Sequence, residues 1–198
     1  MIQTLLDLDK NLLLTLHTLI PPTWAPLMKI LGESIVIFWA LTLLGIWIQG
    51  LRKKENLYKV IALQIFFTII LTFVFYTVIN FWLPKWRPGG MEITGATALI
   101  PHPIDNSFPS GHALFTAALI VGLSRFWRYR PIIIFAFVFW VITGLARVIG
   151  WVHYPWDILA GWLFGGIFAL LTSHLVKHIF FGKYIFPFFI RLASVFHL

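Results

Sequence analysis

The sequence contains no cysteine, which excludes disulfide bonds, thiolate catalysis and cysteine-ligated zinc. Charged residues are also scarce, because they make up 11% of the chain where ordinary soluble domains have about 25%. Hydrophobic residues account for 60% of the 198 positions, against about 45–50% in a soluble domain. This balance excludes an ordinary water-soluble domain and indicates a membrane protein, and the length suits one helical bundle rather than two domains.

Acidic residues are the rarer charge, with 7 Asp and Glu against 15 Lys and Arg, which gives a formal net charge of +8. A basic chain can bind nucleic acid. Here, however, the basic residues fall in short gaps between apolar runs, so a membrane explains them better and no nucleic-acid partner is expected. The N-terminal segment MIQTLLDLDK carries two acidic residues and no basic stretch ahead of an apolar run, so we expect no cleavable signal peptide.

Five apolar segments are predicted to cross the membrane as helices, each near the length of about 20 residues that a span needs. They cover residues 28–49, 58–83, 110–126, 131–149 and 156–176, the third being the shortest. No segment shows the strand alternation of a barrel, so the expected fold is an all-α integral membrane helical bundle. Gly161 and Gly165 form a small-xxx-small pattern in the fifth span, which predicts close packing against a neighbouring helix.

The two ends of the chain differ from these spans. In residues 1–22, polar side chains recur at helical spacing opposite a row of leucines; they are Gln3, Asp7, Lys10 and His17. This pattern predicts an amphipathic helix in the membrane interface, which would be the sixth helix of the core. A sixth span is the alternative, and Asp9 with its charged neighbours disfavours it. Residues 179–198, rich in Phe and broken by Pro187, are predicted to form an interfacial tail.

Basic residues gather in alternate gaps between the predicted spans. Ten of them fall on one side of the membrane if the spans alternate: Arg52, Lys53, Lys54, Lys59, Arg125, Arg128, Arg130, Lys177, Lys183 and Arg191. By the positive-inside rule that side is cytoplasmic. We therefore expect a multi-pass protein of the plasma (inner) membrane, with the loop of residues 84–108 on the outer, periplasmic side.

The junction of the fourth and fifth spans carries Arg147, His153 and Asp157. Pro155 suits the first turn of the fifth helix, and a spacing of four can bring His153 and Asp157 to one face there. A carboxylate bonded to one imidazole nitrogen fixes the tautomer and leaves the other nitrogen free to attack. Arg147 supplies a permanently charged fork suited to phosphate oxygens.

The entry to the third span carries Pro109-Ser110-Gly111-His112. Backbone N–H groups at a helix start favour an anion, and Gly111 lets the backbone approach it closely. The Ser110 hydroxyl adds a donor, and His112 is a candidate general acid. Each of these residues alone has an ordinary structural explanation, such as a helix cap. Their convergence on the same side of the membrane as Arg87, Arg147 and the second histidine favours a joint function.

Other polar residues receive no catalytic assignment. His174 and His178 lie at the cytoplasmic end of the fifth span, where an interfacial role is favoured over metal binding. His102 is expected to shape the outer loop. Glu33, near the outer end of the first span, is expected to pair with a site arginine or to cap a helix.

These motifs resemble the type 2 phosphatidic acid phosphatase superfamily, which also includes vanadium haloperoxidases and bacterial acid phosphatases. The family pattern is Lys-x6-Arg-Pro, then Pro-Ser-Gly-His, then Ser-Arg-x5-His-x3-Asp. The second motif is intact here, and the third departs only at Ala146, which replaces the leading Ser. In the first motif Asn80 stands seven residues before Arg87 in place of Lys, and Lys85 is the alternative source of that positive charge.

The resemblance implies that His153 attacks phosphorus and becomes phosphohistidine, that Asp157 orients it, and that His112 protonates the leaving group. The groups implied to hold the phosphate oxygens are Arg87, Arg147, Ser110 and the Gly111 amide, with Lys85 and Asn80 as further candidates. The resemblance implies no metal and no other cofactor, because the guanidinium groups supply the positive charge.

The resemblance to small bacterial members implies a lipid phosphate or diphosphate substrate taken from the membrane. An outward-facing site favours conversion of undecaprenyl diphosphate to undecaprenyl phosphate, which serves cell-wall synthesis. Phosphatidylglycerophosphate, phosphatidic acid and lipid A phosphate stay open as substrates, as does transfer of the phosphate to another lipid. A non-catalytic lipid-phosphate transporter is the alternative from a different class. The sequence does not specify the oligomeric state.

Overall fold

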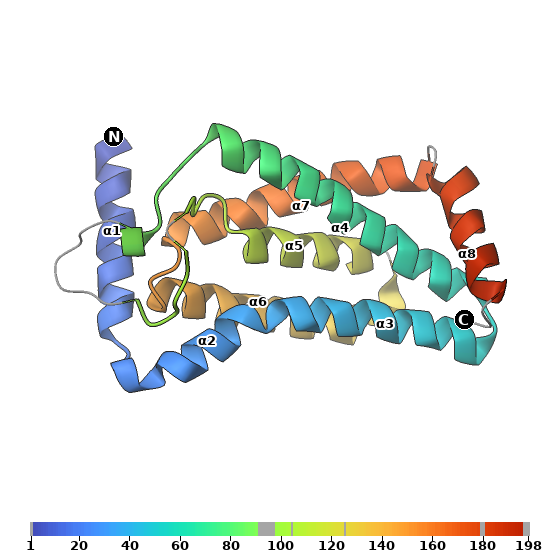
Figure 1. Cartoon of the computed structure of the whole chain (residues 1–198), viewed down its shortest axis with the longest axis horizontal. Coiled ribbons are helices and arrows are strands. Elements are labelled where there is room, and N and C mark those ends of the chain that lie inside the picture. The colour runs from blue at the N-terminus through green and yellow to red at the C-terminus, as the bar shows by residue number, and fades with distance from the viewer. Residues whose placement is uncertain (1, 91–97, 104, 125, 179–180, 196–198) are drawn as a thin grey trace.

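The computed structural model describes residues 2–90, 98–103, 105–124, 126–178 and 181–195. Its long helices run side by side along the longest axis of the molecule (Figure 1). The helices are α1 (Ile2–Thr18), α2 (Ala25–Glu33), α3 (Ile35–Lys53), α4 (Asn56–Trp82), α5 (Gly111–Ser124), α6 (Arg130–Ile149), α7 (Pro155–His178) and α8 (Phe186–Val195). Short 3-10 turns occupy Pro22–Trp24, Pro88–Gly90 and Trp127–Tyr129, and a short π-helix occupies Phe181–Ile185.

Within the described residues, four helical stretches are long and apolar enough to cross a membrane. They are Pro22–Lys53, Asn56–Trp82, Arg130–Ile149 and Pro155–Val176, and α5 is apolar but shorter. In the first stretch α2 and α3 meet at Ser34, where the helical rod bends (Figure 1). Helices satisfy their own backbone groups, which a lipid environment requires. The predicted all-α membrane bundle is therefore confirmed.

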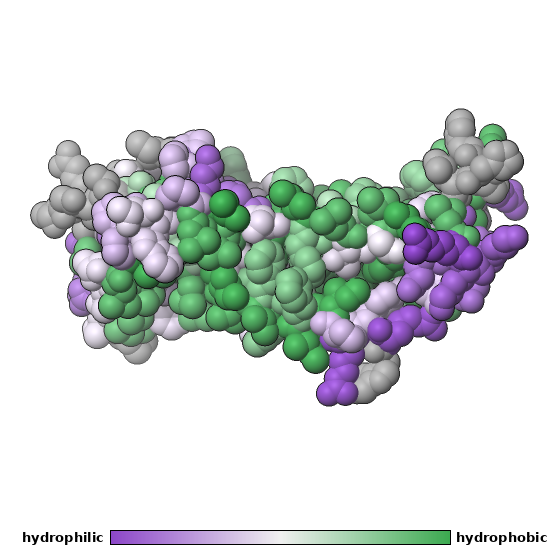
Figure 2. Space-filling model, turned by 90° about the horizontal axis from the view of Figure 1, so that it is seen from below, coloured by the Kyte–Doolittle hydropathy of each residue, from purple (hydrophilic) through white to green (hydrophobic). Residues whose placement is uncertain are grey.

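On the face that Figure 2 shows, a hydrophobic band covers the middle of the molecule and separates two more polar ends. Large apolar side chains of the candidate spans are exposed, among them Ile37, Phe135 and Leu163, at 63%, 56% and 58%. A soluble protein rarely exposes so continuous an apolar surface. The band marks where lipid covers the protein, and the chain is a multi-pass membrane protein.

Helix α1 lies across one end of the bundle, nearly perpendicular to the long helices, and α8 lies at the opposite end (Figure 1). One face of α1 packs inward through Leu13, which is fully buried in a cluster with Val148 and Trp151. The interfacial position of residues 1–22 stays a prediction. The same holds for the tail of residues 179–198, of which 179–180 and 196–198 lie outside the described residues.

Helices α5 and α7 pack with their backbones in contact at two glycines of α7. A Cβ atom added to Gly161 would lie 2.5 Å from the Ser110 carbonyl oxygen, and one added to Gly165 would lie 2.2 Å from that of Leu114. No side chain fits at such distances, so the predicted small-xxx-small packing is confirmed. The contact fixes the beginning of α5 beside the beginning of α7.

Substituting Gly165→Ala is expected to destabilise the protein by about 1–3 kcal/mol, because the new methyl group would push α5 and α7 apart. Gly166→Ala is the matched control, since no atom lies within 4 Å of a Cβ at that position. Alanine is also the better helix former, so the control should keep or raise stability. Thermal unfolding in detergent measures both variants, and equal midpoints would contradict the packing described here.

Candidate active site

The turn between α6 and α7 accounts for the five-residue spacing between Arg147 and His153. The Arg147 carbonyl at the end of α6 accepts the Val152 N–H at 3.0 Å and the His153 N–H at 3.3 Å. Trp151 makes this return possible with φ 67°, a left-handed conformation that costs an L-residue about 1–2 kcal/mol. The turn thus satisfies a free carbonyl of α6 and holds the backbone of the histidine against that of the arginine.

His153 and Asp157 face each other at the start of α7 and are almost fully buried, at 2% and 0% exposure. Asp157 Oδ2 accepts the Tyr154 N–H at 2.9 Å and lies 3.7 Å from His153 Nδ1, which is an electrostatic contact longer than a hydrogen bond. Burial lowers the pKa of His153 to about 3, and the attraction of Asp157 only partly opposes this. The imidazole is therefore neutral near pH 7 and has a free lone pair.

Arg87 lies against the imidazole ring of His153. Its Nη1 donates to the Val152 carbonyl at 3.0 Å and lies 3.2 Å from His153 Nε2. The same Nη1 lies 3.5 Å from Nδ1, so the shorter contact favours Nε2 as the accepting nitrogen, with the proton on Nδ1 toward Asp157. The Arg87 Nε donates to Asp105, which fixes the other side of the guanidinium group.

The beginning of α5 is attached to the first turn of α7, because the Ser110 N–H donates to the Asp157 carbonyl at 2.9 Å. The Ser110 hydroxyl is buried and has no hydrogen-bond partner among the described residues. At Gly111, a Cβ atom would lie 3.5 Å from the Tyr76 ring, in ordinary van der Waals contact. The N-terminal amides of α5 and the Ser110 hydroxyl are therefore donors available to an anion.

Arg147, His112 and Glu33 form a second cluster beside this helix start. Arg147 is 1% exposed, and its Nη1 donates to Glu33 Oε1 at 2.8 Å and to the Gly32 carbonyl at 3.2 Å. His112 Nε2 lies 3.3 Å from Glu33 Oε2 and 3.4 Å from Arg147 Nη1. The expectation that Glu33 pairs with a site arginine is confirmed. The Arg147 Nε has no hydrogen-bond partner among the described residues.

The structure thus brings most of the sequence-predicted residues to one end of the bundle. These are His112, His153, Asp157, Arg87, Arg147, Ser110 and Gly111. Asn80 and Lys85 have other partners. The Asn80 side-chain amide donates to the Phe108 carbonyl at 3.0 Å. The backbone carbonyl of Asn80 accepts a hydrogen bond from the side-chain amide of Asn106. Asn80 therefore holds the backbone that leads into α5.

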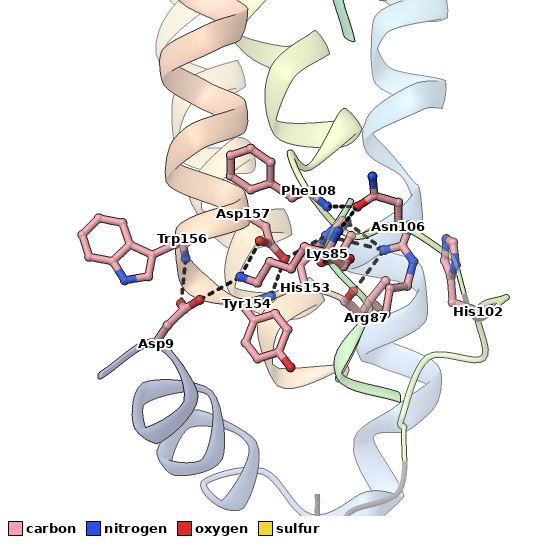
Figure 3. A network of polar contacts seen from close by, with 12 residues as sticks. Asp9, Lys85, Arg87, His102, Asn106, Phe108, His153, Tyr154, Trp156 and Asp157 are labelled. Carbon is pink, nitrogen blue, oxygen red and sulfur yellow. Dashed lines mark hydrogen bonds and ion pairs between the residues drawn. The ribbon is translucent and has the colours of Figure 1, made fainter. Parts of the chain in front are cut away.

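Lys85 links the site to α1 through two buried carboxylates (Figure 3). Its Nζ donates to Asp157 Oδ1 at 2.8 Å and to Asp9 Oδ2 at 2.9 Å, and it lies 4.0 Å from the centre of the Tyr154 ring. Asp9 is 2% exposed and accepts the Trp156 N–H at 3.0 Å. Burial raises the pKa of Asp9, while the bonds from Trp156 and Lys85 act in the opposite direction. We call Asp9, Lys85 and Asp157 the charge triad.

Sequence reasoning missed Asp9, Asp105 and Asn106. The one available signal for Asp9 is its position four residues before Leu13, because residues at this spacing share a helix face and Leu13 is the buried leucine of α1. Asn106 Oδ1 accepts the backbone N–H of Lys85 at 2.8 Å and that of Phe108 at 3.0 Å. It therefore joins the segment that follows α4 to the segment that precedes α5. No motif or spacing indicates these loop contacts.

The arrangement combines a neutral imidazole, two buried guanidinium groups, a buried hydroxyl and the start of a helix. Positive charge and directed donors of this kind hold a tetrahedral oxyanion such as phosphate. His102 lies at the edge, 3.8 Å from Asp105, and burial lowers its pKa. Among the described residues no three His, Asp or Glu side chains lie together as a metal site would require. Residues 91–97 and 104 of the outer loop lie outside the described residues.

Known proteins are similar to this chain over most of its length. The model of the PAP2 superfamily matches residues 57–181. A lipid A 1-phosphatase of Rhizobium johnstonii is 32% identical over 126 residues, which are 61% of this chain and 50% of that protein. Undecaprenyl-diphosphatase BcrC of Bacillus subtilis is 30% identical over 161 residues, which are 78% of this chain and 72% of that protein. This chain therefore spans about half the length of the lipid A 1-phosphatases that it matches.

Two solved structures have the same fold. Aquifex aeolicus LpxE superposes with a TM-score of 0.65 at 21% identity, over 84% of this chain and 95% of that one. A PAP2-type phosphatidylglycerolphosphate phosphatase from Bacillus subtilis superposes with a TM-score of 0.63 at 22% identity, over 89% of this chain and 88% of that one.

Proposed function

This chain belongs to the PAP2 superfamily, and from that membership we propose that it is a membrane lipid phosphatase acting through a phosphohistidine intermediate. The observation that carries the proposal is the environment of His153. Its ring is buried and neutral, Asp157 faces Nδ1, and the nucleophilic Nε2 faces the cationic Arg87. A phosphate group drawn to that guanidinium group would meet the lone pair of Nε2.

In the proposed first step, Nε2 of His153 forms a bond to phosphorus and the bond from phosphorus to the leaving oxygen breaks. His112 gives its proton to that oxygen, so the lipid product departs protonated. Glu33 Oε2 lies 3.3 Å from His112 Nε2 and favours a proton on that nitrogen, which supports this role, while the Arg147 guanidinium group at 3.4 Å opposes it. Asp157 stabilises the positive charge that develops on the ring of His153.

In the second step, water attacks the phosphohistidine and gives a proton to His112, which now acts as a base. The bond from Nε2 to phosphorus breaks, inorganic phosphate leaves and both histidines return to their starting states. Arg87, Arg147, Ser110 and the Gly111 amide would hold the phosphate oxygens throughout. The unpartnered Ser110 hydroxyl and Arg147 Nε support this assignment, because buried donors are rarely left unused.

Lys85 and Asn80, both candidates for holding phosphate from the sequence, are proposed to act indirectly. Lys85 would keep Asp157 ionised, because its Nζ lies on Oδ1 while Oδ2 faces the histidine. Asn80 would position the start of α5 through the Phe108 carbonyl. The positive charge that the family places at residue 80 is in this way replaced by an uncharged scaffold.

The outer face is the proposed location of the site. The basic residues near the α3–α4 turn lie at the opposite end of the molecule from the candidate site (Figures 1 and 2). By the positive-inside rule that end is cytoplasmic in the plasma (inner) membrane. An outward site and the resemblance to BcrC favour hydrolysis of undecaprenyl diphosphate to undecaprenyl phosphate. Phosphatidylglycerophosphate, phosphatidic acid and lipid A phosphate are the alternative substrates.

A paired hydrolysis assay tests this function. Purified protein in detergent is expected to release phosphate from undecaprenyl diphosphate faster, as judged by kcat/KM, than from phosphatidic acid or phosphatidylglycerophosphate. Phosphate released should equal substrate lost, and a phosphorylated lipid acceptor would instead indicate phosphotransfer. Preference for a glycerophospholipid would change the substrate and keep the enzyme class. Failure of folded protein to hydrolyse any of these lipids would favour the non-catalytic transporter.

A further inference from the structure

A polar hollow lies at the end of the bundle opposite His153. It has a volume of about 630 Å³ and lies where α3 ends, α4 begins and the Trp127–Tyr129 turn leads into α6. Its lining residues are Gln49, Lys53, Glu55, Tyr58, Arg128, Tyr129 and Ile132. Strongly hydrophilic side chains gather at this end of the molecule, next to the hydrophobic band (Figure 2). We call this hollow the headgroup pocket.

The headgroup pocket has the chemistry of an anion site. Tyr58 is 2% exposed, and its hydroxyl accepts a hydrogen bond from Lys53 Nζ at 2.9 Å. The Arg128 guanidinium group lies 4.9 Å from the centre of the same ring. One aromatic ring thus holds two cations at the wall of one pocket, despite their mutual repulsion. An anion between them would relieve that repulsion.

Two helix beginnings reinforce this preference. Glu55 and Tyr129 are the N-cap residues of α4 and α6, and neither helix start receives a side-chain capping bond. The partial positive charge of both helix starts adds to that of Lys53 and Arg128, while the C-terminal end of α3 contributes a partial negative charge. Glu55 is the one acidic residue of the lining, which reduces the formal charge of the lining to +1. A single negative charge, rather than a multiply charged group, is the best match.

An apolar groove continues from the headgroup pocket into the hydrophobic band. It has a volume of about 400 Å³ and shares Gln49, Tyr129 and Ile132 with the pocket. Its other lining residues are Phe38, Leu41, Thr42, Gly45 and Ile46. The α3 residues from 38 to 49 cover about 16 Å along a helix, roughly half the hydrocarbon thickness of about 30 Å. The groove is thus as long as one leaflet is deep.

We propose that this composite cavity binds a phospholipid with one net negative charge, of the phosphatidylglycerol class. The phosphodiester lies between Lys53 and Arg128, the headgroup hydroxyls donate to Glu55, and one acyl chain occupies the groove beside α3. Basic pockets between transmembrane helices bind anionic headgroups in this way. The bound lipid joins the ends of α3, α4 and α6 and so stabilises the bundle. The site is separate from the proposed catalytic centre.

Glycine 45 allows the acyl part of the proposal to be tested on its own. Gly45 lines the groove, and outside its own stretch of helix no atom lies within 4 Å of a Cβ there, so the side chain of Gly45→Leu has room to enter the groove. Gly166→Leu is the matched control, because that glycine of α7 is equally open. For the headgroup part, Lys53→Gln combined with Arg128→Gln removes both cations and keeps polar side chains. The melting temperature of each delipidated variant shows first that it is folded.

The experiment titrates delipidated protein in detergent with phosphatidylglycerol, phosphatidylethanolamine, phosphatidylcholine or free glycerol phosphate, and follows thermal unfolding. Phosphatidylglycerol is expected to raise the melting temperature in a saturable manner, with one lipid retained per chain in native mass spectrometry. The double charge variant should need about 25-fold more lipid for half of the maximal shift. Each basic residue near the membrane contributes ~1 kcal/mol to the binding of an anionic lipid, and 1.4 kcal/mol corresponds to a tenfold change in affinity. Gly45→Leu should lose the shift and Gly166→Leu should keep it.

Several outcomes overturn the proposal. Equal shifts from phosphatidylglycerol and either zwitterionic lipid would remove the anionic preference. An equal shift from free glycerol phosphate would make the hollow an anion site without a lipid. A wild-type response in both Gly45→Leu and the double charge variant would place the lipid elsewhere on the protein.

Discussion

Substituting His153→Ala is expected to lower kcat by about 10⁴-fold or more, the scale seen when a covalent nucleophile is removed. The expectation follows from the geometry around the ring, where Nε2 faces Arg87 and Nδ1 faces Asp157. No other imidazole has both neighbours among the described residues. Phosphate release from undecaprenyl diphosphate in detergent measures the effect.

His174→Ala is the control for this variant, because His174 is an exposed histidine in the last part of α7, far along the helix from the site. It should retain wild-type turnover. Since His153 is buried, thermal unfolding must show that His153→Ala is folded before its activity is interpreted. A folded His153→Ala protein with turnover within tenfold of wild type would exclude this residue as the nucleophile.

Substituting Lys85→Met is expected to lower both stability and turnover. It leaves two buried carboxylates, Asp9 and Asp157, without the cation that lies 2.9 Å and 2.8 Å from them. Removing one partner of a buried ion pair costs about 3–5 kcal/mol, because the remaining charge stays buried. Asp157 would also take up a proton more readily and stabilise the ring of His153 less. We expect kcat to fall about 100-fold, or about 2.7 kcal/mol of activation free energy.

The double variant Asp9→Asn, Lys85→Met tests whether charge balance is the reason. It removes one negative and one positive charge, so the triad returns to its original net charge. Most of the lost stability should be regained, together with part of the turnover. Lys10→Met is the matched control, since Lys10 is an exposed lysine beside Asp9 on α1. If the double variant has a melting temperature no higher than that of Lys85→Met, charge balance within the triad is not the reason that Lys85 stabilises the protein.

The spans and the motifs could be predicted from the sequence because both are local properties. A run of apolar residues long enough to cross the membrane determines a helix wherever it lies, and the bounds of α6 and α7 agree with prediction within two residues. The three motif segments converge because spans alternate in direction, which is a topological argument and needs no distances. Their grouping at one end of the bundle was therefore predictable.

The charge triad was not predictable, because its members lie far apart along the chain. Asp9 and Lys85 are separated by 76 positions, and their contact depends on how α1 lies across the bundle. The leucines of α1 predict an apolar face and give no indication of which residue points inward. Leu5, Leu6 and Leu8 are in fact exposed, while Asp9 is buried. A polar residue on a packed face is recognisable only once that face is known.

The partner of Lys85 was equally hard to predict from the sequence. Lys85 has a long flexible side chain, and its position two residues before Arg87 is compatible with several directions. The structure directs its ammonium group to the back of Asp157, where Tyr154 and Asp9 complete its surroundings. The spacing of the motif pointed to Lys85 as a residue of interest, but it could not indicate that Asp157 and Asp9 are its partners.

The central claim is that a bond forms between Nε2 of His153 and phosphorus during turnover. The most direct measurement is rapid quenching of wild-type protein with substrate labelled at the transferred phosphate, followed by peptide mapping. The account predicts a label on the peptide that contains His153, stable in base and lost in acid, formed at least as fast as product. A label on any other residue, or inversion of configuration at phosphorus with no labelled protein, would contradict it.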